Sequence, residues 1–165
     1  MAAQLTYGYD TPKAVPGMIA DLAEIEVASR ANDENDGVLK FGMGVVVGAH
    51  AGRSVKKPVS GSTAAVFEGV VVAREHTEQD MNGRVVVQKG STVSVLKRGN
   101  IWARLADADT QPGYGATAYL IVSGDDAGCF TAASADGVDV GAKFGAEAQK
   151  NAAGTKFDLV RITIG

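Results

Sequence analysis

Short runs of valine and isoleucine, separated by glycine-rich and polar turns, constrain the fold of this 165-residue chain more than any other feature. They occupy residues 25–28, 44–48, 66–73, 84–88, 92–96, 101–105, 118–122 and 157–164. β-branched side chains suit the pleated surface of a sheet, and short strands at regular spacing are typical of barrels and sandwiches. The sequence therefore predicts a mainly β fold: a compact β-barrel or β-sandwich domain with at most one or two short helices.

The distribution of glycine supports this interpretation. The chain has 21 glycines, well above the usual share of about 7%. They are spread between the apolar runs, as expected for turns and bulges of a sheet. Helical signals are weak: the candidates for a few turns are residues 22–30 and 142–151, and Gly145 interrupts the second.

The clearest predicted hairpin spans residues 91–105. Val93 and Val95 alternate with polar residues, residues 98–100 (RGN) supply a turn, and residues 101–103 (IWA) begin the return strand. We therefore expect Trp102 in the core or at a subunit interface. Phe67 and Tyr119, which lie in similar strand-like runs, are expected there as well.

The first 20 residues have a different character from the rest of the chain. They contain two prolines, two tyrosines and isolated apolar residues, and no period of 2 or 3.6 persists. We interpret residues 1–20 as an extended N-terminal arm and residues 21–165 as a single β-rich domain; a merely frayed terminus is the alternative. Its candidate contacts with its own domain or another molecule are Leu5, Tyr7, Tyr9, Val15, Pro16, Met18 and Ile19.

Charge, hydropathy and cysteine content narrow the possible partners. A net charge of −3, with 16 basic and 19 acidic residues, gives no basic patch for nucleic acid. The most apolar stretch, residues 41–49, is too short to cross a bilayer, and the N-terminus lacks a signal-peptide pattern. A single cysteine, Cys129, excludes an intramolecular disulfide and is expected as a small buried side chain in a protein made in a reducing cytoplasm.

Sequence patterns for catalysis are weak. The two histidines, His50 and His76, lie near no recognisable nucleophile motif and have no zinc-ligand spacing with Cys129. Carboxylate pairs at Asp107 and Asp109, or at Asp125 and Asp126, resemble glycosidase pairs only by proximity and are interpreted as solvated charges. We predict that the chain is not an enzyme and has no cofactor.

One acidic loop, residues 32–37, has the alternating oxygen side chains of a calcium loop. The match fails where the bidentate glutamate is required, because that position is Met43. We interpret it as an ordinary solvated loop and predict no metal site.

Several segments, taken in order, resemble the capsid structural cement (decoration) proteins of tailed bacteriophages. They are residues 16–21 (PGMIAD), 67–70 (FEGV), 90–95 (GSTVSV), 99–103 (GNIWA), 113–119 (GYGATAY) and 128–131 (GCFT), followed by a terminal hydrophobic strand. The resemblance covers nearly the whole chain. It rests on glycines and apolar residues in a fixed order and includes no catalytic fingerprint.

This resemblance implies a virion protein, made in the bacterial host cytoplasm, that sits on the outer capsid surface. Such a protein bridges neighbouring major capsid proteins and stabilises the mature head. The implied partners are the major capsid protein and further copies of this chain, with no nucleic acid and no membrane. We expect a homotrimer or, failing that, a dimer, because closed symmetry lets identical arms reach equivalent neighbours.

Two other functions stay open. The first is a non-catalytic phage receptor-binding or carbohydrate-binding β module, for which Trp102, Tyr114 and Tyr119 are the main aromatic candidates after the arm. Their apolar or glycine-flanked contexts favour packing over sugar binding. The second is a hydrolase with an unrecognised site, which requires a cleft that gathers carboxylates or a histidine.

Overall fold

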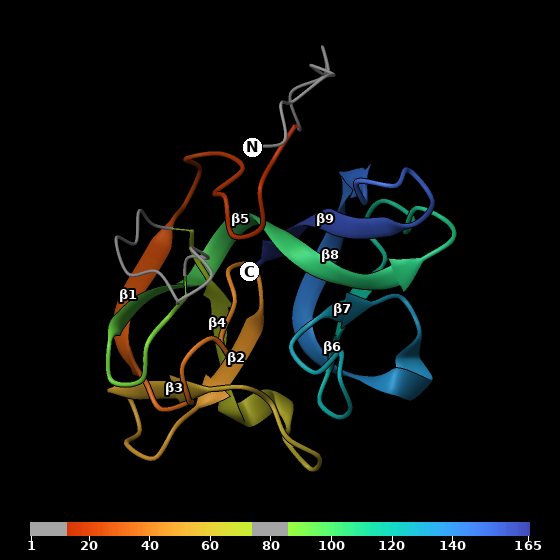
Figure 1. Ribbon diagram of the computed structural model, residues 1–165. Coiled ribbons are helices and arrows are strands. Elements are labelled where there is room, and N and C mark those ends of the chain that lie inside the picture. Colours follow the sequence, from red (N-terminus) through yellow and green to blue (C-terminus); the bar gives the residue numbers. More distant parts are fainter. Residues whose placement is uncertain (1–12, 74–85) are drawn as a thin grey trace, which may run out of the picture.

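The structure is a computed structural model that describes residues 13–73 and 86–165 (Figure 1). Its elements are β1 (Glu26–Asn32), β2 (Gly44–Val47), β3 (Ser54–Lys56), η1 (Ala64–Val66), β4 (Phe67–Val71), β5 (Thr92–Ala108), β6 (Thr117–Ile121), β7 (Phe130–Thr131), η2 (Ser134–Asp136), β8 (Gly137–Lys150) and β9 (Phe157–Ile164). The two helices in this part of the chain are single 3₁₀ turns. The predicted mainly β fold is confirmed.

The strands form two rings that share β5 (Figure 1). In the first ring, β1, β3, β2, β4 and the N-terminal half of β5 pair in this order, and β5 pairs with β1 to close a five-stranded barrel. In the second, the C-terminal half of β5 pairs with β9, followed by β8, β6 and β7. This second ring returns to β5 through one residue pair, Leu105 with Phe130.

The predicted hairpin at residues 91–105 is wrong, because β5 runs straight through it. Gly99 has φ of +125°, a backbone conformation that side-chain-bearing residues rarely adopt. Here β5 changes partners, from Arg98 opposite Glu26 of β1 to Gly99 opposite Ile164 of β9. The residues expected to reverse the chain therefore mark the crossing of one strand between two rings.

Neither of the two weak helix candidates forms a helix. Residues 142–151 lie almost entirely in β8, where buried Ala142 and Phe144 alternate with exposed Lys143. Residues 22–30 hold a turn followed by most of β1. Pairing of β8 with β6 on one edge and β9 on the other supplies backbone hydrogen bonds that outweigh the weak helix propensity of these sequences.

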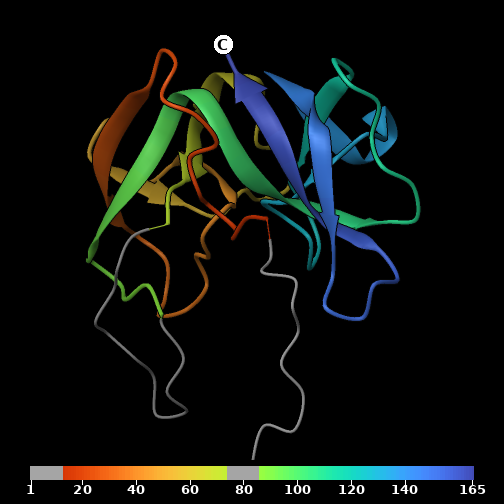
Figure 2. The same cartoon turned by 90° about the horizontal axis from the view of Figure 1, so that it is seen from above.

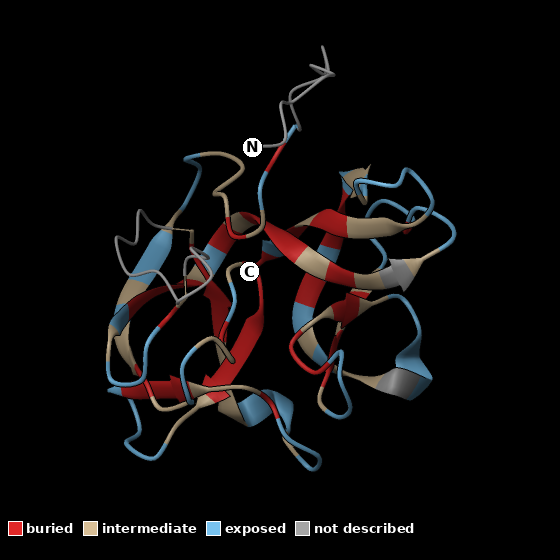
Figure 3. Ribbon diagram, viewed as in Figure 1, coloured by how far each residue is buried: buried red, intermediate tan, exposed pale blue. Residues whose placement is uncertain are grey.

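Neighbouring side chains of β4 and β5 pack into two different hydrophobic cores. Val71, Val93 and Val95 belong to the cluster inside the first barrel, whereas Val70 and Leu96 join the larger cluster of the second ring. Successive side chains of a strand point to opposite faces, so strands that lie between the rings are buried on both faces. Figure 3 shows buried residues continuing along β5 from one ring into the other.

No helix in the described ranges combines the length and the apolar character needed to cross a bilayer.

Candidate functional site

Residues 14–20, the part of the predicted arm nearest the domain, lie along β5 (Figure 2). The Gly17 N–H donates to the Trp102 carbonyl at 2.7 Å, and the Trp102 N–H donates to the Met18 carbonyl at 2.9 Å. The Ala20 N–H donates to the Asn100 carbonyl at 2.9 Å. These bonds occupy the edge of β5 opposite β9, so the segment is held like a short additional strand.

Gly17 fixes where this segment meets the domain. Its φ is +82°, and a Cβ atom there would lie 2.7 Å from the Ala73 backbone nitrogen. The Ala73 N–H also donates to the Gly17 carbonyl at 2.8 Å. Only glycine permits this close backbone approach, which anchors the segment to the end of β4 as well as to β5.

Trp102 is buried beneath the same segment, with 4% of its surface exposed. It clusters with Ala14 and Leu159, and the partly buried Met18 and Ala20 pack against this group. The arm segment therefore covers the tryptophan, a contact between distant parts of the chain that the sequence did not predict.

The other predicted contact residues fall into three groups. Val15 keeps 50% of its surface exposed, and Pro16, Met18 and Ile19 are half-buried. Phe67 and Tyr119 are half-buried, with Phe67 packed against the core of the second ring. Leu5, Tyr7 and Tyr9 lie outside the described residues.

Asp21 secures the far end of the covering segment. Asn100 Nδ2 donates to both carboxylate oxygens of Asp21, at 3.0 and 2.9 Å, and Arg161 forms an ion pair with the same group. Thr163 Oγ1 donates to Asn100 Oδ1. The Asn100 hydrogen bonds, aided by the Ala23 N–H and the Arg161 charge, lower the pKa of Asp21. This carboxylate thus ties residue 21 to β5 and β9.

Asn32 and Asp33, at the start of the acidic loop, are structural rather than simply solvated. Asn32 is 1% exposed, and its Nδ2 donates to the Gln88 carbonyl at 2.9 Å. The Asp33 carboxylate accepts hydrogen bonds from Ser54 Oγ and from the Ala49 N–H. These bonds lower the pKa of Asp33, with the Ser54 bond the largest cause.

The rest of the acidic loop also holds its neighbours. Glu34 Oε1 accepts from the Lys57 N–H at 3.1 Å, and Asp36 Oδ1 accepts from the Lys89 N–H at 2.8 Å. Oxygen atoms that the sequence placed in a calcium-like pattern are therefore used on backbone amides of adjacent segments. Within the described ranges, no group of three or more His, Cys, Asp or Glu residues is arranged to hold a metal ion.

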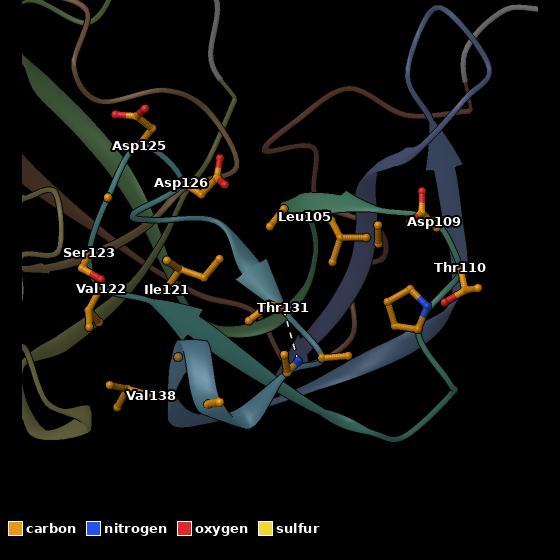
Figure 4. A pocket seen from close by; sticks show the side chains of 18 residues that line it. Leu105, Asp109, Thr110, Ile121, Val122, Ser123, Asp125, Asp126, Thr131 and Val138 are labelled. Atoms are coloured by element: carbon orange, nitrogen blue, oxygen red, sulfur yellow. Dashed lines mark hydrogen bonds between the residues drawn. The ribbon is translucent and has the colours of Figure 1, made fainter.

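A hollow of about 840 Å³ opens on the second ring (Figure 4). Leu105, Ile121 and Val138 contribute apolar side chains to it, and Asp109, Asp125 and Asp126 contribute carboxylates. Figure 4 shows Asp125 and Asp126 on one side and Asp109 on the other, with Leu105 between them. The lining comes from distant segments, so no local sequence signal could have identified this groove.

The carboxylates and histidines that the sequence analysis considered for catalysis lie as follows. All three carboxylates are exposed to solvent. His50 is exposed and is not among the residues that line the groove, and His76 lies outside the described residues. The Asp107 side chain is likewise not described.

Cys129 is half-buried rather than fully buried as expected. It lines a smaller adjoining hollow with Lys40, Lys57 and Arg104. Burial raises the pKa of the thiol, and the nearby Asp126 charge adds to this. A raised pKa keeps the thiol protonated near neutral pH, which makes Cys129 a poor nucleophile.

Comparisons with known proteins agree with this geometry. The family model for structural cement protein (E217 gp24/Pam3 gp6) matches residues 3–165. A chain from the solved structure "The capsid of Myoviridae Phage XM1" has the same fold, with a TM-score of 0.74 and 16% identity over 100% of this chain and 98% of that one. No curated protein sequence matches the chain. With its fold and nearly its full length matched, the chain belongs to the phage structural cement proteins, which are components of the capsid.

Proposed function

We propose that this protein binds the outer surface of a phage head, bridges neighbouring major capsid proteins and stabilises the mature shell. The observation that carries the proposal is the family match across residues 3–165. The shared strand supports it, because two rings joined by β5 form one continuous packed body rather than two linked modules. A protein that binds only the mature shell stabilises that shell by mass action.

The N-terminal segment is proposed as one attachment element. Gly17, Trp102 and Asp21 fix residues 14–21 on the domain, so the preceding residues leave from a defined point on β5. Val15, half exposed at this point, is an apolar side chain available to a partner. One such segment binds weakly because ordering costs about 1–2 kcal/mol per residue. Several on one oligomer bind together with much higher avidity.

Mature heads assembled without this protein should bind it in co-sedimentation, whereas unexpanded precursor heads should bind it weakly. Saturated heads should then release DNA at a higher temperature or after longer chelator exposure than bare heads, because bound protein must dissociate before neighbouring shell subunits separate. Cryo-electron microscopy of saturated heads would show where the protein sits. Absence of binding to mature heads would contradict the proposal.

We also propose that the protein is a homotrimer, in preference to a dimer. Closed symmetry presents identical attachment segments to equivalent shell neighbours, and a trimer triples the contacts formed per binding event. Multi-angle light scattering of the purified chain should give about three times the monomer mass of 16.9 kDa. A monomeric mass, both for the free protein and for protein released from heads, would contradict this assignment.

A further inference from the structure

The acidic groove of the second ring lies where the sheet is incompletely paired. Among the described residues, β5 pairs with β7 at Leu105 and Phe130, and β5 continues to Ala108. At Ala108 the strand pairs with Phe157 of β9, which occupies the other edge. Ala106 and Ala108 line the groove, so beyond Leu105 the edge of β5 that faced β7 borders open space.

An open strand edge beside an apolar hollow suits an extended peptide. Main-chain groups along such an edge can pair with an added strand, and pockets next to it select alternate side chains. Other segments already pair with this edge of β5. Residues 17–20 hydrogen-bond to it at Asn100 and Trp102, and the Gly42 carbonyl accepts from the Arg104 N–H. β7 pairs with it at Leu105. The groove is the next position along the same edge.

The charge of the groove identifies the kind of segment that fits. Among the residues that the structure describes, its lining includes Asp109, Asp125 and Asp126 and no lysine or arginine. None of the three carboxylates forms an ion pair with another residue of the described ranges. The adjoining hollow shares Asp125 and Asp126 with the groove and is also lined by Lys40, Lys57 and Arg104. Asp109 lies at the far side of the groove and does not line that hollow. A partner that carries basic side chains complements this rim.

We propose that the groove binds an extended segment of the shell protein that alternates apolar and basic side chains, by adding it to the open edge of β5. The apolar side chains fill the hollow beside Leu105, Ile121 and Val138, and the basic ones face the aspartates. This inference rests on the proposed function and adds a contact independent of the N-terminal arm.

The test compares matched variants of the full chain on mature heads made without it. Asp109→Asn with Asp125→Asn removes two groove charges, and Glu24→Gln with Glu26→Gln removes two exposed charges on and next to β1. Ala132→Arg adds bulk inside the groove and a positive charge that repels the basic side chains of the proposed segment. Ala51→Arg makes the same change on an exposed loop of the first ring. All substituted side chains are exposed, and circular dichroism melts verify that each variant folds.

The groove variants should bind heads more weakly than their controls. We expect about a fivefold loss for the double asparagine variant, smaller at high salt where the charges are screened. For Ala132→Arg we expect a loss of more than tenfold. As a direct probe, overlapping synthetic peptides of the shell protein should bind the wild-type chain only where basic and apolar residues alternate, and Ala132→Arg should abolish this binding.

Four outcomes would overturn the inference. Groove variants that bind heads as well as their controls would leave the capsid role intact and remove the groove from it. Tighter binding of a synthetic peptide of residues 1–12 than of any shell peptide would assign the groove to the N-terminal arm. Loss of the oligomer in Ala132→Arg would make the groove a self-interface. Failure of the wild-type chain to bind heads at all would refute the proposed function itself.

Discussion

Trp102→Ala should lower the free energy of unfolding by about 3–5 kcal/mol, the usual cost of removing a large buried aromatic side chain. The tryptophan is 4% exposed and packs with Ala14 and Leu159, so its removal leaves a cavity under the segment that covers it. Because this segment hydrogen-bonds to the Trp102 backbone, it should also become easier to detach. Urea denaturation followed by far-UV circular dichroism measures the loss.

Tyr114→Ala is the matched control for that experiment. Tyr114 is 82% exposed in a loop, and its removal should change the free energy of unfolding by no more than about 0.5 kcal/mol. Equal stabilities for Trp102→Ala and Tyr114→Ala would mean that the tryptophan is not packed as described.

Two N-terminal truncations should separate the contribution of residues 14–20 to stability from the contribution of residues 1–12 to head binding. A chain that begins at Asp21 loses the three backbone hydrogen bonds to β5 and uncovers Trp102. At about 0.5–1.5 kcal/mol net per bond, with the lost apolar contacts added, it should be less stable by about 3 kcal/mol or more. A chain that begins at Lys13 keeps these contacts and should retain nearly full stability.

The Lys13 truncation isolates the attachment role of Leu5, Tyr7 and Tyr9. It should bind mature heads much more weakly than the full chain, and the loss should exceed that for a single binding segment if several act on one oligomer. Thermal melts and head co-sedimentation on both truncated chains separate the two effects. If the Lys13 truncation binds heads as tightly as the full chain, Leu5, Tyr7 and Tyr9 are not contacts. If the Asp21 truncation has the same melting temperature as the full chain, residues 14–20 do not stabilise the fold.

The fold class was predictable because valine-rich runs and glycine turns are local features. Which strands pair with one another was not predictable, and the wrong predictions concern strand pairing. Around Gly99 the local pattern is that of a hairpin, and only the partners β1 and β9 make it one continuous strand. β3 was not among the predicted apolar runs, since three residues with one valine carry little periodicity even though Ser54 and Val55 are buried.

The candidate site was predictable only in part. The sequence marked Trp102 as a packed residue and Met18 as a candidate contact of the arm. In the structure, Gly17 and Met18 have backbone hydrogen bonds with Trp102. The groove depends on β5 extending beyond its pairing with β7 and on three aspartates that come from two loops. The sequence marked Asp109 and the pair Asp125 and Asp126 as carboxylates near one another in the chain, but only tertiary pairing brings the two loops to one hollow.

Sharing β5 between the rings has a mechanical consequence. Tension that pulls the rings apart along β5 is carried by the covalent backbone of this strand and by the hydrogen bonds that flank it, which are loaded in shear and must break together rather than one by one. A flexible linker in its place would extend under the same load before transmitting any force. Under the proposed function, two shell subunits bound to opposite rings would therefore be joined by a stiff connection that allows little relative movement.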